Sequence, residues 1–215
     1  PAYEQSSDQE VAFQAVDYIL RVLKKNMVFG MTWGRAMHEF VEQLAKDERL
    51  RSLSFQNVKV VPFLGTPGAI QSDSWNTTTY SNTLATKVGN LLHCASYNLS
   101  APMYVEGTKE KELIESIDEI AKVLHMAETA DIALIGIGSM QDDSSIIKAE
   151  IRTKEEYKEL VRKGAVGEIV GRIYDKNGQT VDEDLKRKMV GISLDKIAKI
   201  PVRVGMSYGK DKIEA

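Results

Sequence analysis

The chain has 215 residues, which is long enough for one large domain, or two small ones, with a core that needs neither a disulfide nor a structural metal. Hydrophobic residues make up 43% and charged residues 27%, so the composition excludes a disordered, collagen-like or low-complexity chain. With 28 basic and 31 acidic residues the net charge is -3, and the surface lacks the basic excess that sequence-independent nucleic-acid binding requires.

The cysteine content and the absence of long apolar runs indicate the compartment. Cys94 is the single cysteine and cannot form a disulfide within the chain, which fits a reducing environment. No apolar run approaches the roughly 18 residues of a membrane span, and no signal-peptide pattern opens the chain. We therefore expect a cytoplasmic protein with no membrane partner.

The first third of the chain predicts helices alternating with buried strands. Apolar spacing predicts an amphipathic helix over residues 9–23, and the short apolar run at 27–32 predicts a strand covered on both faces. After a glycine turn, helical spacing resumes over 37–45. Residues 57–63 predict a second buried strand, followed by a loop at 64–68 that is rich in glycine and proline.

The middle of the chain continues the alternation. A helical stripe covers 84–95, and we expect a short strand over 101–106. The clearest helical stripe in the protein runs from Leu113 to Leu124. Residues 132–139 form a continuous apolar run ending in two glycines, which predicts a central parallel strand that opens into a loop.

The last third predicts shorter elements. A capping box of Thr153 and Glu156 starts a short helix. The glycine-rich segment 164–175 and the tight-turn pair Asn177-Gly178 together predict a strand, a turn and a strand. We also expect a helical turn over 194–198, a last strand over 202–206, and the opening turn of a further helix at 212–215, so that the natural protein continues past both ends.

At least four predicted strands alternate with helices, and most of these strands end in glycine. This pattern predicts an α/β protein with a largely parallel sheet flanked by helices. The loops of such a sheet gather along one edge, and ligands bind there.

The strongest local signal for chemistry is the turn Thr32-Trp33-Gly34-Arg35-Ala36, between a buried strand and a helix. The start of a helix leaves N–H groups unpaired and carries partial positive charge, and a glycine lets an anion approach the backbone. Arg35 adds a charged fork that suits phosphate. The turn therefore predicts a phosphate site, although a plain structural turn with a solvated Arg35 remains an alternative.

Other cofactor and catalytic motifs are not matched. Gly136-Ile137-Gly138 resembles the first half of the dinucleotide fingerprint, but Gln141 stands where the third glycine belongs, so we expect no nicotinamide cofactor. The three histidines lack partners at metal-ligand spacing, so we expect no metal. Glu168 and Lys210 or Lys212 remain, because a carboxylate accepts sugar hydroxyls and an ammonium group neutralises phosphate or forms a Schiff base.

Four segments together resemble the effector-binding domain of the SorC family of bacterial transcriptional regulators, and the resemblance covers essentially the full length. A match to any one segment alone is weak evidence for the family, but a chance match to the order and spacing of all four is improbable. The segments are Met31 to Arg35, Asp131 to Ser139, Gly164 to Ile169 with Gly171-Arg172, and Pro201 to Gly209.

The resemblance implies a fold similar to that of sugar-phosphate isomerases and a sugar phosphate, or a related carbohydrate, as effector. Residues 1–215 would be one effector-binding domain of a homo-oligomer, a dimer or a tetramer, reaching DNA only through an N-terminal helix-turn-helix domain that this sequence lacks. Carried over by position, Trp33, Gly34, Arg35 and Ala36 would cradle the phosphate, Gly65 and Gly138 would line the pocket, Glu168 would meet sugar hydroxyls and Lys212 would lie at the lip.

This sequence departs from the family pattern at two places. Ala36 stands where many relatives have threonine or another hydroxyl residue, which removes one hydrogen bond to phosphate. The segment Phe63-Leu64-Gly65 lacks the basic or amide side chain that relatives can place there. The resemblance therefore implies a monophosphate, or an unphosphorylated sugar derivative, rather than a bisphosphate.

Two other functions remain open beside a ligand sensor. The first is a sugar-phosphate isomerase or a related enzyme on the same fold, with Asp131 or Glu168 as general base. The second is a helper domain that only oligomerises. A shared fold cannot decide between these functions. The resemblance along the whole chain, and the lack of a second acid or base beside Glu168, favour a non-enzymatic sensor.

Overall fold

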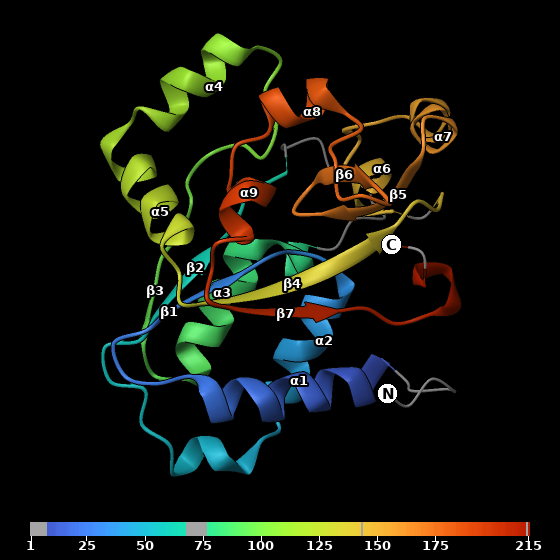
Figure 1. Ribbon diagram of the computed structural model, residues 1–215. Coiled ribbons are helices and arrows are strands. Elements are labelled where there is room, and N and C mark those ends of the chain that lie inside the picture. The colour runs from blue at the N-terminus through green and yellow to red at the C-terminus, as the bar shows by residue number, and fades with distance from the viewer. Residues whose placement is uncertain (1–7, 68–76, 143, 214) are drawn as a thin grey trace.

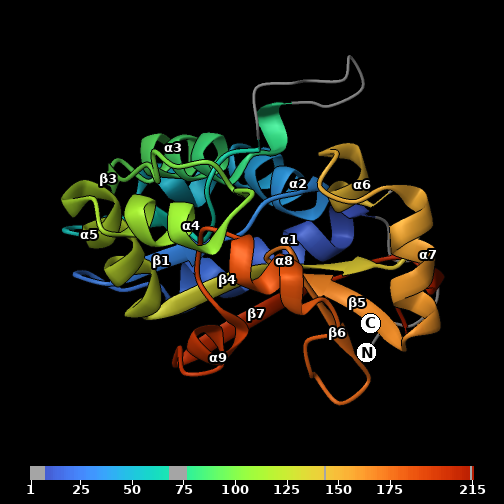
Figure 2. The same ribbon diagram turned by 90° about the horizontal axis from the view of Figure 1, so that it is seen from above.

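The computed structural model of this chain describes residues 8–67, 77–142, 144–213 and 215 (Figure 1). They form an α/β fold with a mostly parallel sheet between layers of helices, as the sequence predicts (Figure 2). Three 3-10 turns, η1 (Glu48–Arg51), η2 (Thr77–Thr79) and η3 (Lys210–Lys212), lie between the main elements. In chain order the main elements are α1 (Asp8–Val22), β1 (Val28–Met31), α2 (Arg35–Leu44), β2 (Lys59–Pro62), α3 (Ser81–Leu91), β3 (Ala95–Ser96), α4 (Thr108–Glu115), α5 (Asp118–Glu128), β4 (Ile132–Ser139), α6 (Ser145–Lys148), α7 (Lys154–Arg162), β5 (Ala165–Ile169), β6 (Arg172–Asp175), α8 (Glu183–Lys188), α9 (Leu194–Ile197) and β7 (Val202–Met206).

The strand pairing brings the carboxyl ends of the central strands to one edge of the sheet. β1 lies between β2 and β4, β3 pairs with β2, and β7 pairs with β4, all in parallel. The last part of β4 extends further and pairs antiparallel with β5, which pairs in turn with β6. Because parallel strands end at the same edge, the segments that follow β1 and β4 lie close together.

The continuous apolar run of β4 is explained by burial on both faces of the sheet. Ile132 and Leu134 pack into a core with α1, α2 and α3, whereas Ala133 and Ile135 pack into a second core with α5, α7 and α9. Figure 1 shows α1 and α2 on one side of the sheet and α5 and α9 on the other. Because successive side chains of a strand point to opposite faces of the sheet, this one segment contributes side chains to two cores.

The apolar stripe from Leu113 to Leu124 is two helices rather than the single helix predicted. α4 ends at Glu115, and α5 begins at Asp118 with Ile117 as its N-cap. Leu113 is 69% and Ile117 51% exposed, so the stripe does not face a core along its whole length. Helical periodicity alone does not reveal such a break, because both helices keep the same residue spacing.

The predicted strand over 101–106 is also wrong. These residues make only isolated bridges, between Pro102 and Thr66 and between Tyr104 and Met189. The edge strand is instead β3, at Ala95–Ser96, which the predicted helical stripe had partly included. The helix stops at Leu91 because the backbone reverses at His93, where φ is +52°.

The strand, turn and strand near residue 170 exist, but the turn is earlier than predicted. β5 and β6 join through Val170 and Gly171, whose φ angles of +54° and +69° are those of a two-residue hairpin turn. A valine rarely adopts positive φ, and here its side chain is 1% exposed, so packing in the core holds the turn. The predicted turn at Asn177-Gly178 is a second reversal, closed by a bridge between Tyr174 and Thr180.

Within the described ranges, no helix combines the length and the apolar character that crossing a bilayer demands.

Candidate functional site

The turn between β1 and α2 is open at the start of the helix. Gly34 is the N-cap of α2, with φ of +102°. Because glycine has no side chain, no side-chain hydrogen bond from this position caps the first-turn N–H groups. The Gly34 N–H itself donates to the Thr79 carbonyl at 2.9 Å. The start of α2 is therefore not closed by a capping side chain, as it would be at an ordinary serine or aspartate cap.

A buried threonine ties this turn to the end of β4. Thr32 is fully buried, and its hydroxyl accepts the Gly136 N–H at 2.9 Å. The Cα of Gly136 approaches the turn closely, since a Cβ there would lie 3.4 Å from the Trp33 carbonyl oxygen. The turn after β1 and the end of β4 are therefore held close together.

These segments enclose a small cavity of about 50 Å³, which we call the α2 cavity. Its lining comes from the start of α2, the end of β4, the start of α6, β5 and η3. Seven of the eight residues predicted from the sequence line it. The lining residues are Trp33, Gly34, Arg35, Ala36, Gly136, Ile137, Gly138, Ser139, Ser144, Ser145, Glu168 and Lys212.

Gly65 is the predicted residue that does not line the α2 cavity. It is buried, its N–H donates to the Val190 carbonyl at 3.1 Å, and a Cβ at this position would lie 2.5 Å from the Ala101 carbonyl oxygen. Gly65 therefore lets two chain segments pack closely, and the structure places it outside the lining of the α2 cavity. The end of the predicted loop, at Gly68, lies outside the described residues.

Glu168 is the acidic group of the cavity, and it is only 6% exposed. It lies on β5 opposite Gly138 of β4, and a Cβ on Gly138 would come within 2.6 Å of the Glu168 Oε2 atom. Its Oε1 atom accepts the Gly171 N–H at 2.5 Å, across the hairpin turn. The glycine of β4 therefore makes room for the carboxyl group, and the hairpin turn orients it.

Burial raises the pKa of Glu168, while hydrogen bonds from Gly171 and Trp33 and the charges of Lys212 and Arg172 act in the opposite direction. A carboxyl group with a raised pKa holds its proton more readily, so it can donate as well as accept a hydrogen bond. This property suits recognition of a ligand hydroxyl, which also both donates and accepts.

Arg172, on β6 close behind Glu168, is a charged residue that sequence reasoning did not place at the site. It is 3% exposed, and its Nη2 group donates to the carbonyls of Met189, Gly191 and Ile192 at 3.3 to 3.4 Å. Burial lowers the pKa of Arg172 to about 10, against the attraction of Glu115 and Glu168. Arg172 therefore stays charged at neutral pH and stabilises the ionised form of Glu168. The sequence feature that could have identified Arg172 is its position in the Gly171-Arg172 pair.

Three serines of the cavity, Ser139, Ser144 and Ser145, were also not assigned to the site from the sequence. Ser144 is the N-cap of α6, where its hydroxyl accepts the Ile147 N–H, and the Ser145 hydroxyl lies across from Gly34. The polar run that follows the glycines of β4 was a usable signal, because that loop opens at the same sheet edge.

Asp131, the alternative general base, lies at the wrong end of β4. Its carboxylate accepts the Val28 N–H at 2.7 Å, at the start of β1, whereas Glu168 pairs with Gly138 near the end of β4. Gly138 lies seven residue steps of extended strand beyond Asp131, which corresponds to more than about 20 Å. Asp131 therefore cannot act on a ligand in the α2 cavity.

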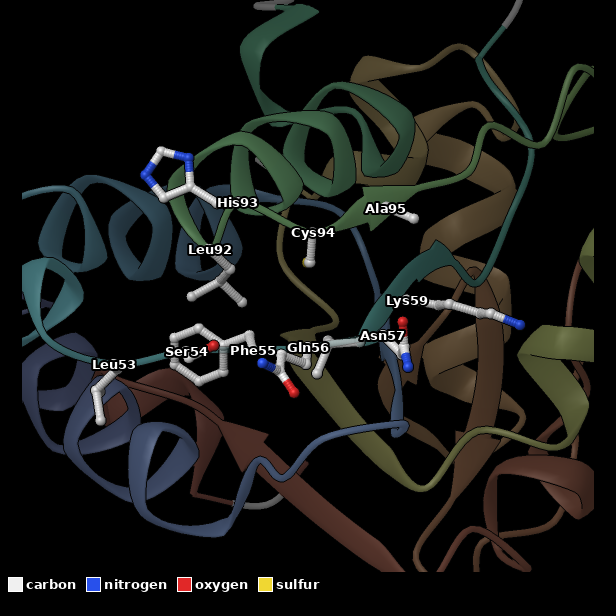
Figure 3. A pocket seen from close by; sticks show the side chains of 11 residues that line it. Leu53, Ser54, Phe55, Gln56, Asn57, Lys59, Leu92, His93, Cys94 and Ala95 are labelled. Carbon is white, nitrogen blue, oxygen red and sulfur yellow. The ribbon is translucent and has the colours of Figure 1, made fainter.

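A separate hollow of about 660 Å³ lies at the opposite edge of the sheet, before β2 and β3. Figure 3 shows Leu92, Cys94 and the Phe55 ring facing one another across it. Burial raises the pKa of the Cys94 thiol to about 11, so the group stays protonated at neutral pH and is not an activated nucleophile. Among the described residues, no group of three or more His, Cys, Asp or Glu side chains could hold a metal ion.

Glu168→Gln is expected to flatten the pH dependence of stability. Because the folded-state pKa of Glu168 is raised above its ordinary value of 4.5, its contribution to stability is fully present below pH 4.5 and is lost as pH rises through the raised pKa. Urea unfolding of both proteins from about pH 4 to about pH 8 measures the difference. Glu155→Gln, at an exposed position in α7, is the control, and a wild-type curve parallel to that of Glu168→Gln would contradict the assignment.

The chain is similar in sequence to transcriptional regulators. A family model described as "Putative sugar-binding domain" matches residues 1–215. The transcriptional regulator LsrR of Enterobacter sp. (strain 638) is 25% identical over 205 residues, which cover 94% of this chain and 58% of LsrR. The sorbitol operon regulator of Klebsiella pneumoniae is 27% identical over 194 residues, covering 89% of this chain and 58% of the regulator. The chain thus spans a little under three fifths of these relatives.

Solved structures share the fold. The full-length sorbitol operon regulator SorC from Klebsiella pneumoniae superposes with a TM-score of 0.83 at 24% identity, covering 97% of this chain and 66% of that one. A DeoR family transcriptional regulator from Listeria monocytogenes gives a TM-score of 0.82 at 23% identity, covering 99% of this chain and 81% of that one. At these identities the likeness establishes the architecture, while the family follows from the sequence match.

Proposed function

Because this chain belongs to the family of sugar-binding domains of SorC-type transcriptional regulators, we propose that the ligand it senses is a phosphorylated sugar bound in the α2 cavity. The observation that carries the proposal is the open start of α2, flanked by Arg35 and Lys212, in the same cavity as the buried Glu168. A cation pair and a helix start attract an anion, and a buried carboxyl group recognises hydroxyls.

Each part of the cavity has its own task in this proposal. The phosphate accepts hydrogen bonds from first-turn N–H groups of α2 and from Arg35, while Lys212 neutralises charge from the η3 side. Glu168 exchanges hydrogen bonds with a sugar hydroxyl, the Gly171 N–H keeps the carboxyl group oriented, and the charge of Arg172 favours its ionised form. Ala36 offers no hydroxyl, so a monophosphate fits better than a bisphosphate.

The domain acts as a sensor in the proposed protein. Ligand binding favours one arrangement of a dimer or tetramer over another and so alters DNA binding by an attached helix-turn-helix domain, in the cytoplasm. Similarity to LsrR and to the sorbitol operon regulator, both described as regulators, supports this assignment.

An isomerase on the same fold is the second candidate, and it rests on Glu168 as a buried carboxyl group with a raised pKa. The position of Asp131 at the far edge of the sheet removes the other proposed base. A single carboxyl group can move a proton between adjacent carbons of a sugar, so Glu168 does not separate the two candidates, and the similarity to transcriptional regulators is what favours binding over turnover.

Thermal unfolding of the 215-residue chain with a panel of pentose and hexose monophosphates tests the proposal. A ligand present at about 100 times its dissociation constant adds about 2.7 kcal/mol to the free energy of unfolding. The matching unphosphorylated sugars are the controls. Isomerised product in the same samples would support the enzyme, whereas no stabilisation by any compound would support a domain that only oligomerises.

A further inference from the structure

The hydrogen bonds between β1 and β4 end on a side chain instead of on a backbone carbonyl. The register of the two strands runs to Met31 and Leu134, and the Thr32 N–H then donates to the Leu134 carbonyl at 3.1 Å. In a continued parallel ladder the Gly136 N–H would donate next to the Thr32 carbonyl. It donates instead to the Thr32 hydroxyl, at 2.9 Å. The Thr32 side chain therefore takes the place of the next backbone acceptor.

This replacement lets the chain leave the sheet directly after β1. Only three residues separate β1 from α2, and a hydrogen bond fixes each end of this turn. The Thr32 hydroxyl joins its first residue to Gly136 of β4, and the Gly34 N–H joins its last residue to the Thr79 carbonyl at 2.9 Å. Contacts of the turn with β4 and with η2 therefore place the start of α2, where Gly34 supplies no capping side chain.

The segment of β4 that donates to Thr32 also carries the other side of the α2 cavity. Gly136 pairs with Met206 of β7, and Gly138, two residues further on, pairs with Glu168 of β5. Two residues of strand span about 7 Å. Figure 1 shows β4 running on toward β5. The Thr32 hydroxyl therefore attaches the start of α2 to the stretch of backbone against which Glu168 lies.

Thr32 itself is fully buried and is not part of the described lining of the α2 cavity. A ligand in the cavity does not meet this hydroxyl, so Thr32 acts on it only through the backbone that it holds. The contact is also costly to remove, because a buried N–H group that loses its acceptor keeps the full penalty of having left water.

We propose that Thr32 is the positioning residue of the α2 cavity, whose hydroxyl fixes the start of α2 against β4 so that the first-turn N–H groups are in place before the anion arrives. This inference rests on the proposed function of the cavity. A turn that is fixed beforehand loses no further freedom on binding, so affinity is not reduced by an ordering cost. Without the hydroxyl, the Gly136 N–H either stays unpaired or draws the backbone carbonyl of residue 32 toward it, and both outcomes displace the start of α2.

Phosphate binding by Thr32→Val tests the proposal. Valine keeps the branched shape of threonine and replaces the acceptor by a methyl group. With inorganic phosphate as probe, calorimetric titration is expected to give binding roughly three- to tenfold weaker than wild type, the range for one uncharged hydrogen bond. Thr32→Ser keeps the acceptor and is expected to keep the wild-type affinity. If Thr32→Val does not fold, Thr32→Ser and Thr32→Ala give the same comparison, because they differ by the hydroxyl group alone.

Ser81→Ala is the control for a loss that is merely structural. The Ser81 hydroxyl is buried, donates to the Leu64 carbonyl at 2.8 Å, and belongs to a residue outside the described lining of the cavity. Its removal is expected to lower stability in urea unfolding and to leave phosphate affinity unchanged. If Thr32→Val binds phosphate as tightly as wild type does, the inference is overturned while the proposed function stands.

Hydrogen exchange reports the position of the turn without any ligand. The Gly34 N–H is expected to exchange faster in Thr32→Val than in wild type, relative to the Phe63 N–H, which donates to the Met31 carbonyl at 2.9 Å before the turn. If inorganic phosphate does not bind wild type, the proposed function fails, and the relative exchange of Gly34 alone decides the role of Thr32. An unchanged ratio in Thr32→Val overturns the inference.

Discussion

Replacing Arg35 with alanine is expected to weaken the binding of a phosphorylated sugar by roughly tenfold to a hundredfold, the usual effect of losing a hydrogen bond to a charged group. The unphosphorylated form of the same sugar should bind nearly as before, because Glu168 meets it on the other side of the cavity. Titration calorimetry with both ligands measures the two losses. Arg35 opens α2 and lines the α2 cavity, so in the proposed complex its guanidinium group contacts the phosphate.

Arg51→Ala is the matched control for this experiment. Arg51 is an exposed arginine in η1, outside the α2 cavity, and its removal changes the net charge by the same amount. We expect no change in binding of either ligand. Equal weakening of both ligands by Arg35→Ala would show that Arg35 holds the turn together rather than the phosphate.

Gly65→Ala is expected to destabilise the fold by about 3 kcal/mol or more, the upper range for forcing a carbon into a packed interior. The added Cβ would lie 2.5 Å from the Ala101 carbonyl oxygen and 2.6 Å from that of Pro102. Both are backbone atoms and cannot rotate away, unlike the end of a flexible side chain. Urea unfolding measures the loss, and the folded fraction should keep the wild-type ligand affinity.

Gly107→Ala is the control for the added methyl group. Its Cβ would meet only the flexible Glu110 side chain, at 3.6 Å or more, so the expected loss is under about 1 kcal/mol. If Gly65→Ala unfolds like wild type but binds ligand poorly, Gly65 belongs to the ligand site after all.

The sequence alone predicted much of the site because the α2 cavity is built from chain segments with strong local signals. Gly34 and Arg35 follow a buried strand and open a helix, which is a local pattern. Gly138 ends the strongest apolar run of the chain. Because strands of a parallel sheet end at one edge, two such signals already imply proximity. Glu168 and Lys212 were candidates on their chemistry, but only the family resemblance attached them to that edge, because no local pattern does so.

The errors lie where a residue's role depends on contacts with distant segments. Gly65 has the appearance of a loop glycine, and only the approach of Ala101 reveals that it is a packing residue. Asp131 is adjacent to β4 in sequence, but at the end of the strand away from the α2 cavity. The turn at Val170 could not be expected, since valine avoids positive φ unless packing compensates.

By itself the sequence determined the alternation of helices and strands, the edge of the sheet at which the segments after β1 and β4 meet, and the glycine turn that opens α2. These follow from periodicity and glycine placement, which act over a few residues. Only the tertiary structure decided that Glu168 is buried against Gly138, and that Arg172 is buried on the strand that pairs with β5. The burial and the electrostatic surroundings of those residues depend on segments that lie far apart in the chain. A pattern of a few neighbouring residues does not contain that information.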